Sequence, residues 1–291
     1  MLIRDIFKNK KPVISFEIFP PRKEYTIDTI FNTIYELKDL NPDFISVTYG
    51  SGGGSRDRTV EIASLIKNKY NIECLAHLAC ISSTDSEATE ILDQLERNGI
   101  NNVLALRGDL PIDFKRTGTM TYKYAKDLVS KIVNKGGFSI GAAANPEGHI
   151  ESLNLKEDMK YLKQKVDAGV DFLITQLFFD NEAIYRFRES CLRANISVPI
   201  SAGIMPVLNK NQIKRMVELS GASLPSKFIR IMDKYENNTE ALREAGIAYA
   251  TEQIIDLLSW GIDGIHIYTM NKADVTKRIV NNISEIRMSL K

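Results

Sequence analysis

A cation, a glycine and a carboxylate stand together where an apolar run of the chain ends. Residues 103–106 are apolar, and they are followed directly by Arg107, Gly108 and Asp109. An unbroken apolar run of this kind is typical of a strand covered on both faces of a parallel sheet. Glycine lets the backbone approach a ligand closely, and the two charged groups can bind polar atoms. Taken alone, the motif would more often be a solvated turn with a surface ion pair.

The same arrangement recurs where other apolar runs end. Hydrogen-bonding side chains follow these runs at Glu17, Thr48, Tyr49, His77, Gln176, Tyr268 and Thr269. Carboxyl and imidazole groups can transfer protons, and amides and hydroxyls can orient a substrate. The carboxyl ends of the strands of a parallel barrel lie at one mouth, so we expect these side chains to share a functional site. His266 lies inside an apolar strand, and we expect it to be structural.

Two other kinds of site receive less support from the sequence. Residues 50–55 resemble a phosphate-binding loop, but they lack the Gly-Lys-Ser/Thr ending, and Ser55 stands where a dinucleotide fingerprint has its third glycine. We interpret this run as a lid or a close-packed turn. The sequence has no HExxH motif and no cluster of cysteine and histidine residues, so we expect no metal site.

Composition favours a soluble protein of the cytoplasm. The chain has 291 residues, of which 44% are hydrophobic and 26% charged, and its net charge is +1. This charge gives no basic field for nucleic acid or for an anionic membrane. The three cysteines form no CxxC pair, which suits a reducing compartment. We find no signal peptide and no apolar run long enough to span a bilayer.

The pattern of apolar residues predicts eight strands that alternate with helices. The strands are expected at residues 13–19, 44–48, 73–78, 102–106, 139–143, 172–176, 199–203 and 264–268. This rhythm, in a length near the ~250 residues typical of the fold, predicts a (β/α)8 TIM barrel as one catalytic domain over residues 1–291. An extra helical segment is expected around residues 222–242. A doubly wound open sheet is the competing architecture, but it more often has about six strands and a glycine-rich first turn.

Seven motifs along the chain resemble those of the 5,10-methylenetetrahydrofolate reductase family. They are SFEIFPPR, SVTYGSGG, AHLAC, LALRGDLP, NPEGH, KVDAGVDFLITQLFFD and GIMPV, which surround Glu17, Thr48, His77, Asp109, His149, Gln176 and Pro206 in turn. The resemblance covers nearly the whole chain in order, and most predicted barrel units carry a motif. The length corresponds to the catalytic domain of the bacterial enzymes, without the regulatory domain of the eukaryotic ones.

The resemblance implies a flavoprotein that holds FAD at the mouth of the barrel. The residues implied to bind FAD are Thr48, Tyr49, His77, Arg107, Gly108, Asp109, Tyr124, Ala143, His149, Glu151, Asp158 and Lys165. It also implies that methylenetetrahydrofolate is reduced with electrons from NAD(P)H, most simply NADH. Glu17 is then the general acid, Asp109 lies near flavin N1 and the pterin, and Gln176 orients the pterin and the nicotinamide. Met216 stands where well-known members carry a phenylalanine that stacks on both ligands.

The chain departs from the family pattern at a few positions. Asn145 stands where the family often has a tyrosine, and Gly148 replaces a valine. At Met216 a thioether replaces an aromatic ring, and it can cover a ring face without stacking as an aromatic does. An electron-donating iron–sulfur partner protein in place of free NADH therefore stays open as an alternative. A flavin-free barrel lyase or aldolase is a more remote one, and the family resemblance suggests a homo-oligomer.

Overall fold

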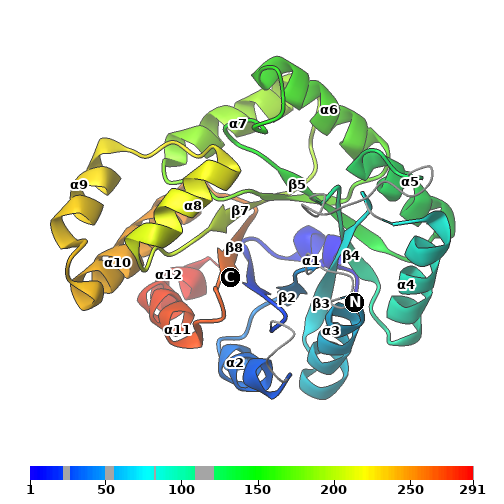
Figure 1. The fold of residues 1–291 in the computed structure, drawn as a ribbon, viewed down its shortest axis with the longest axis horizontal. Coiled ribbons are helices and arrows are strands. Elements are labelled where there is room, and N and C mark those ends of the chain that lie inside the picture. Colours follow the sequence, from blue (N-terminus) through cyan, green and yellow to red (C-terminus); the bar gives the residue numbers. More distant parts are fainter. Residues whose placement is uncertain (22–26, 50–55, 82, 109–120, 291) are drawn as a thin grey trace.

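Eight parallel strands close into a barrel in the computed structural model, which describes residues 1–21, 27–49, 56–81, 83–108 and 121–290. The strands follow one another around the barrel in sequence order, as Figure 1 shows. They are β1 (Val13–Ile18), β2 (Phe44–Val47), β3 (Glu73–Ala79), β4 (Asn102–Leu106), β5 (Ser139–Ala144), β6 (Phe172–Thr175), β7 (Ile200–Ile204) and β8 (Gly264–Tyr268). Each strand begins and ends within one residue of its predicted bounds. The prediction of a (β/α)8 TIM barrel is therefore confirmed.

Helices surround the strands and cover the outer face of the barrel (Figure 1). They are α1 (Ile3–Asn9), α2 (Asp28–Lys38), α3 (Arg56–Tyr70), α4 (Asp85–Arg97), α5 (Ala125–Lys135), α6 (Leu155–Asp167), α7 (Asn181–Arg193), α8 (Lys210–Ser220), α9 (Ser226–Tyr235), α10 (Thr239–Trp260), α11 (Ala273–Asn282) and α12 (Ser284–Ser289). A capping box forms at the start of α4, where Thr84 accepts from the backbone N–H of Glu87 at 3.2 Å and Glu87 accepts from that of Thr84 at 2.7 Å. Such a cap contributes about 1 kcal/mol to the stability of a helix.

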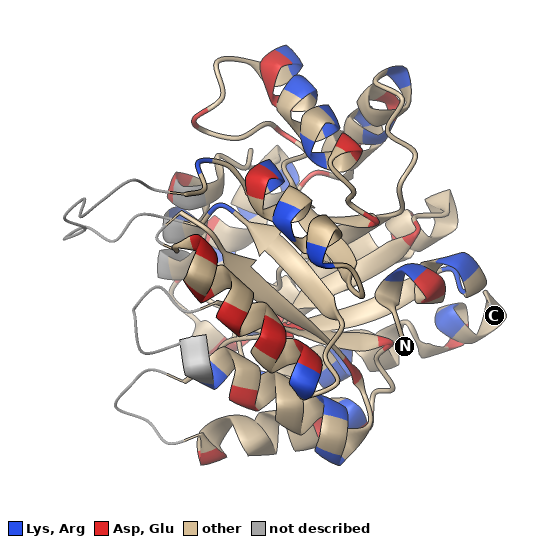
Figure 2. Ribbon diagram, turned by 90° about the vertical axis from the view of Figure 1, so that its right-hand side faces the viewer, with Lys and Arg blue, Asp and Glu red and all other residues tan. Residues whose placement is uncertain are grey.

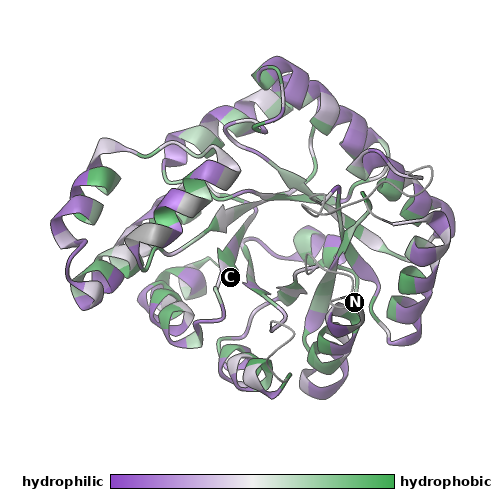
Figure 3. Ribbon diagram, in the orientation of Figure 1, coloured by the Kyte–Doolittle hydropathy of each residue, from purple (hydrophilic) through white to green (hydrophobic). Residues whose placement is uncertain are grey.

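The alternation along each strand separates the core under the helices from the barrel interior. In β1 the side chains of Ile14, Phe16 and Ile18 join the large core between strands and helices. Ser15 and Glu17 point the other way, into the barrel. Figure 3 shows mainly hydrophobic strands, and helices that carry both hydrophobic and hydrophilic residues.

The amino-terminal end of the barrel is sealed by helix α1, which the sequence pattern did not predict. Ile3 and Ile6 pack against residues that face the barrel interior at its amino-terminal end, among them Val13, Phe44 and Phe172. The backbone N–H of Ile3 also donates to Oδ1 of Asn102 at 2.8 Å. With seven residues, α1 is too short to show a clear period, and its stability comes from this packing. The amino-terminal end of the barrel is therefore closed by apolar packing and by this hydrogen bond.

A second hydrophobic cluster builds up beyond the carboxyl ends of β6 and β7. The segment 222–242 contains α9 and the first residues of α10, and α9 packs against α10. The ring of Phe228 stacks on Phe179 at 4.5 Å and meets Tyr249 edge-on at 5.0 Å. Aromatic pairs of this kind add about 0.5–1.5 kcal/mol each beyond their burial. This cluster forms one wall beside the barrel mouth.

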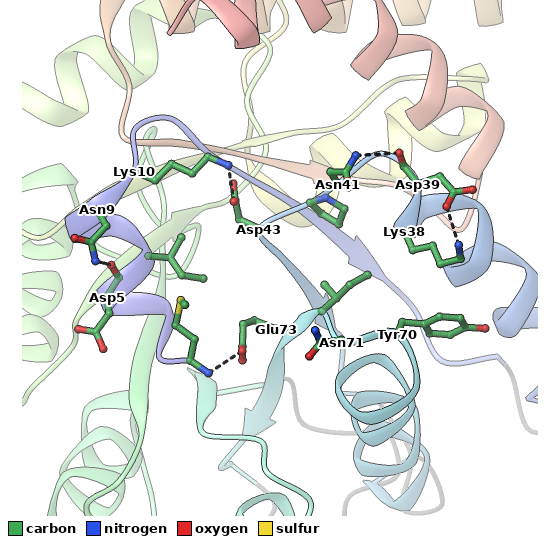
Figure 4. Close-up of a pocket in the computed structure, with 14 residues that line it drawn as sticks. Asp5, Asn9, Lys10, Lys38, Asp39, Asn41, Asp43, Tyr70, Asn71 and Glu73 are labelled. Carbon is green, nitrogen blue, oxygen red and sulfur yellow. Dashed lines mark hydrogen bonds and ion pairs between the residues drawn. The ribbon is translucent and has the colours of Figure 1, made fainter. Parts of the chain in front are cut away.

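Charged residues gather on the outer helices, while the strands carry few of them (Figure 2). No helix among the described residues is long and apolar enough to cross a membrane. A surface pocket lies at the amino-terminal end of the barrel, between α1 and the turns that precede β2 and β3 (Figure 4). Its lining charges are paired, with Lys10 on Asp43 at 2.6 Å and the amino terminus of Met1 on Glu73 at 2.7 Å. It lies at the opposite end from the strand ends that the sequence singles out.

Candidate active site

Four polar side chains from four strands meet inside the upper half of the barrel, and we call them the acid cluster: Glu17, Ser46, His77 and His266. Glu17 lies beside Ser46 in the register of β1 and β2. Its Oε2 atom is 3.5 Å from Ser46 Oγ, 3.5 Å from His77 Nε2 and 3.4 Å from His266 Nε2. All four residues are buried. A carboxyl group held among hydroxyl and imidazole groups at a barrel mouth can donate and accept protons.

Burial sets the protonation state of His77. Removal from water disfavours the imidazolium form and lowers the pKa of His77 to about 4, although the nearby carboxyl of Glu17 acts in the opposite direction. His77 is therefore uncharged near neutral pH. Its Nε2 atom is buried and has no hydrogen-bond partner among the described residues. An unsatisfied polar atom at this depth suits contact with a ligand that supplies the missing partner.

Tyr268 closes the acid cluster on the side of β7. Its ring meets that of His266 edge-on at 5.5 Å, and its hydroxyl donates to the carbonyl oxygen of Thr175 at 2.7 Å. Gly203 makes this position available, because a Cβ there would lie 2.8 Å from the Tyr268 ring and 2.3 Å from the Thr175 oxygen. Burial raises the pKa of Tyr268 well above its usual value, so the phenol stays protonated.

Gln176 follows β6 directly and faces the same mouth. The end of the strand is fixed by Tyr268, which holds Thr175, and by the backbone N–H of Gln176, which donates to the Ala144 oxygen at 2.7 Å. The side-chain oxygen of Gln176 accepts from the N–H of Leu177 at 3.0 Å. Its amide nitrogen makes no hydrogen bond within the described residues, so it remains available to a ligand.

A second group of polar residues lies at the rim above β4 and β5, and we call it the rim cluster: Arg107, His149, Glu151, Asp158 and Lys165. Arg107 pairs with Glu151 across the two loops, with 2.5 Å between Nη1 and Oε2. The pair holds the pKa of Glu151 below its usual value. His149 Nδ1 accepts from the backbone N–H of Glu151 at 3.1 Å. The cluster offers nitrogen donors from Arg107, His149 and Lys165 beside the carboxyl groups of Glu151 and Asp158.

Lys165 is a half-buried cation of the rim cluster. Its amine donates to the carbonyl oxygen of Ala143 at 2.5 Å, from helix α6 to the end of β5. Burial lowers its pKa to about 8, although Asp158 acts in the opposite direction. Asp158 in turn accepts from the hydroxyl of Ser152 at 2.8 Å. Burial destabilises the charged form of such an amine. An anionic ligand bound beside it would stabilise that charge.

Gly108 follows β4 and lies against the end of β3 in a backbone conformation that suits glycine. Its φ is +79°, and a Cβ at this position would lie 2.7 Å from Cβ of Ala79. The backbone N–H groups of Cys80 and Ile81 donate to the carbonyl oxygen of Arg107 at 3.2 and 2.8 Å. The backbone therefore runs close to the neighbouring strand just below the mouth.

The structure describes the other predicted site residues, with one exception. Thr48 and Tyr49 follow β2 and are partly buried, and Tyr124 precedes α5 and is 44% exposed. Met216 lies in α8 and packs against the second hydrophobic cluster. Asp109 lies outside the described residues.

The acid cluster contains two residues that sequence reasoning did not assign to the site. Ser46 and His266 both stand in otherwise apolar strands, where only their places in the period-2 alternation indicate that they face the barrel interior. His266 was expected to be structural, but it lies within 3.4 Å of the carboxyl of Glu17. The alternation applied to all eight strands at once is the signal that could have found both.

Fold and site together define a (β/α)8 barrel protein with a buried carboxyl group and a rim of charged side chains at its mouth. The family model for methylenetetrahydrofolate reductase matches residues 2–284, and the chain belongs to this family. It is 37% identical to the 5,10-methylenetetrahydrofolate reductase of Escherichia coli (strain K12), over 93% of this chain and 90% of the relative.

A plant relative and a solved structure extend the comparison. The chain is 35% identical to methylenetetrahydrofolate reductase (NADH) 1 of Arabidopsis thaliana, over 92% of this chain but 48% of that longer protein. The solved structure is an uncharacterized protein from Clostridium thermocellum that binds two copies of 5-methyl-5,6,7,8-tetrahydrofolic acid. It aligns with a TM-score of 0.68 over 99% of both chains at 15% identity, and this likeness shows the fold alone.

Proposed function

We propose that this chain reduces 5,10-methylenetetrahydrofolate to 5-methyltetrahydrofolate, with FAD as its cofactor and NADH as its electron donor. The observation that carries the proposal is the buried carboxyl of Glu17 at the barrel mouth, surrounded by Ser46, His77 and His266 within 3.5 Å. Membership of the family supports the reaction, and the name of the Arabidopsis relative supports NADH.

The rim cluster fits the anionic part of FAD. Arg107, His149 and Lys165 offer donors to a diphosphate, and Asp158 can accept from a ribose hydroxyl. The amine of Lys165 is the strongest argument, because burial destabilises its positive charge and no carboxylate among the described residues forms an ion pair with it. The unsatisfied Nε2 of His77 suits the isoalloxazine end. We extend the same assignment to Thr48, Tyr49, Gly108, Tyr124, Ala143 and Glu151, and to Asp109.

Glu17 performs the step that the folate requires before it can be reduced. The acid donates its proton to N10 of methylenetetrahydrofolate, the bond from N10 to the bridging carbon breaks, and an iminium ion remains on N5. When bound, the flavin supplies the hydride that reduces this carbon to a methyl group. Gln176 orients the pterin through its free amide nitrogen, and Asp109 binds the pterin by the family resemblance.

Anaerobic titration of the purified protein tests this function directly. A yellow protein whose flavin absorbance is bleached by NADH and restored by methylenetetrahydrofolate is the expected result. A colourless protein that binds no FAD would favour the barrel lyase or aldolase instead. A flavin that reacts with the folate but is reduced neither by NADH nor by NADPH would favour the iron–sulfur partner protein, which should then co-purify.

Met216→Phe is expected to improve reduction of the flavin by NADH. Met216 packs against the second hydrophobic cluster, and so does Tyr268 of the barrel mouth. A stacked aromatic ring adds about 1 kcal/mol beyond burial, or roughly fivefold in affinity for the nicotinamide. Rapid-mixing measurement of flavin reduction at several NADH concentrations should show the gain in the apparent Michaelis constant.

Met216→Leu is the matched control for this change, since it keeps the volume without an aromatic face. We expect it to resemble the unchanged protein within about twofold, because swaps between these residues conserve volume. Equal gains in the leucine and phenylalanine variants would mean that burial, and not stacking, limits the use of NADH.

A further inference from the structure

We propose that Asn271 is a positioning residue for Glu17, because its side-chain amide continues the hydrogen-bonded ladder between β1 and β8 beyond the point where β8 ends. Oδ1 of Asn271 accepts from the backbone N–H of Phe19 at 2.9 Å, and Nδ2 donates to the carbonyl oxygen of Phe19 at 2.8 Å. The inference rests on the proposed function where it concerns the rate of reaction, whereas these hydrogen bonds belong to the protein alone.

The register of the strands shows which backbone groups the amide replaces. Glu17 lies beside Tyr268, and the carbonyl oxygen of Glu17 accepts from the N–H of Thr269 at 3.2 Å. Hydrogen bonds of a parallel ladder are evenly spaced, so in a continued ladder Phe19 would donate to the carbonyl oxygen of Thr269 and accept from the N–H of Asn271. The side chain of Asn271 takes the place of both groups, as acceptor and as donor.

The backbone groups that would have continued the ladder form a turn instead. The carbonyl oxygen of Thr269 accepts from the N–H of Lys272 at 2.8 Å, and the N–H of Asn271 donates to Oγ1 of Thr269 at 3.1 Å. Met270 and Asn271 have φ angles of +50° and +56° in this turn. The left-handed conformation is uncommon outside glycine, although asparagine adopts it several times more often than most residues. Such conformations recur at functional sites, where the surrounding contacts hold them.

Thr269 holds the same strand closer to Glu17. It is fully buried, and its hydroxyl donates to the carbonyl oxygen of Glu17 at 2.6 Å, beside the bond from its own N–H. On the other edge of β1, the N–H of Thr48 donates to the carbonyl oxygen of Ile18 at 3.1 Å. The peptide groups that follow Glu17 are therefore held from both sides.

Phe19 is the last residue after β1 that can donate to a ladder, because Pro20 and Pro21 follow it and have no N–H. Removal of the Asn271 amide leaves the N–H and the oxygen of Phe19 without these partners, so we expect the end of the strand to move and the carboxyl of Glu17 to move with it. A displacement of about 1 Å at a reacting group can slow a reaction about 100-fold.

Hydrogen exchange at the backbone N–H of Phe19 tests the contact without any measurement of activity. Nitrogen-15 spectra of phenylalanine-labelled protein contain amide signals from 12 phenylalanines, and the signal lost in Phe19→Leu is that of Phe19. Asn271→Gly removes the amide and keeps the turn, since glycine adopts positive φ readily. We expect the Phe19 amide to exchange about 10-fold faster in this variant. An unaltered exchange rate overturns the proposal.

The positioning role is tested on the folate half-reaction alone. The flavin is reduced with dithionite and mixed anaerobically with methylenetetrahydrofolate, so that the result does not depend on the electron donor. Asn271→Gly should slow this step by about 10- to 100-fold. Reduction of the flavin by NADH should change by less than about twofold, since no proton from Glu17 is needed there. Equal slowing of both half-reactions would mean that Asn271 shapes the whole mouth, which overturns the role.

Asn271→Asp gives a graded test, because aspartate keeps one of the two hydrogen bonds. Its carboxylate can accept from the N–H of Phe19, but it cannot donate to the Phe19 oxygen. We expect both the exchange rate of Phe19 and the folate rate to lie between those of the unchanged protein and of Asn271→Gly. A folate rate that fails to follow the exchange rate through the three proteins contradicts the positioning role.

Asn102→Ala is the matched control, since it removes a buried amide that also joins backbone groups of different elements. Asn102 begins β4 at the opposite end of the barrel, where Oδ1 accepts from the N–H of Ile3 at 2.8 Å and Nδ2 donates to the carbonyl oxygen of Met1 at 3.3 Å. We expect a lower thermal midpoint and normal half-reactions. Equal slowing of the folate step in Asn102→Ala and Asn271→Gly would show only a general cost to the fold.

The measurements separate this inference from the proposed function. If the unchanged protein transfers no hydride to the folate, the proposed function is wrong, and exchange at Phe19 still decides the contact. A folate rate unaltered in Asn271→Gly refutes the positioning role alone. Flavin content and the thermal midpoint identify a variant that fails to fold, and Asn271→Asp, which keeps the turn and one hydrogen bond, then decides the role in place of the glycine variant.

Discussion

Glu17→Gln is expected to slow the folate half-reaction by about 10²–10⁴-fold, which is the contribution of a positioned general acid. Glutamine keeps the shape of the carboxyl and can still hydrogen-bond in the acid cluster, but it has no proton to give to N10. Reduction of the flavin by NADH should remain within about twofold, because that half-reaction needs no acid at this position. Rapid-mixing measurements of the two half-reactions on the same protein sample give both rates.

Glu73→Gln is the matched control, since it makes the same chemical change at the opposite end of the barrel. Glu73 begins β3 and pairs with the amino terminus of Met1 and with Lys67. Both half-reactions should proceed normally in this variant. If Glu17→Gln slows flavin reduction as much as folate reduction, Glu17 shapes the site and is not its acid. Folate binding should persist in Glu17→Gln, so a loss of binding would point the same way.

The outline of the site could be predicted from the sequence because barrel geometry gathers strand ends. Glu17, His77 and Gln176 each follow an apolar run, and the closed barrel brings these ends to one mouth. Period-2 alternation along residues 13–18 also predicts that Ser15 and Glu17 lie on the face opposite Ile14 and Phe16. The apolar runs and the alternation are both recognised from residues a few positions apart, so a single sequence is enough to find them.

The contacts between strands could not be predicted in the same way. The register of β1 with β8 places Ser15 beside His266, and it depends on closure of the barrel across about 250 residues of chain. Likewise, the contact of Lys165 with Ala143 joins a helix to the preceding strand through a packing angle that local patterns do not contain. Helix α1 escaped prediction because its stability comes from the barrel end that it covers.

Lys165→Met is expected to have opposite effects on the stability of the apoprotein and on its affinity for FAD. Burial lowers the pKa of Lys165 to about 8, so between pH 8 and the usual value of 10.5 the unfolded chain binds more protons than the folded one. The free energy of unfolding of the apoprotein therefore rises with pH across this window. Methionine removes the buried charge, and the apoprotein should gain on the order of 1–3 kcal/mol at pH 7 and lose this pH dependence. Chemical denaturation at pH 7, 8, 9 and 10 measures both.

The affinity for FAD should fall about 10- to 100-fold in Lys165→Met, because a charge-assisted hydrogen bond to the diphosphate is worth about 1.5–3 kcal/mol. In the unchanged protein the affinity should decline above pH 8, as the amine loses the proton that the phosphates need. Lys163→Met is the control, because Lys163 lies on the same helix and pairs with Asp167 at the surface. A surface pair contributes little, so this variant should keep both properties. If Lys165→Met destabilises the apoprotein and binds FAD normally, the amine of Lys165 serves only to join helix α6 to the carbonyl oxygen of Ala143.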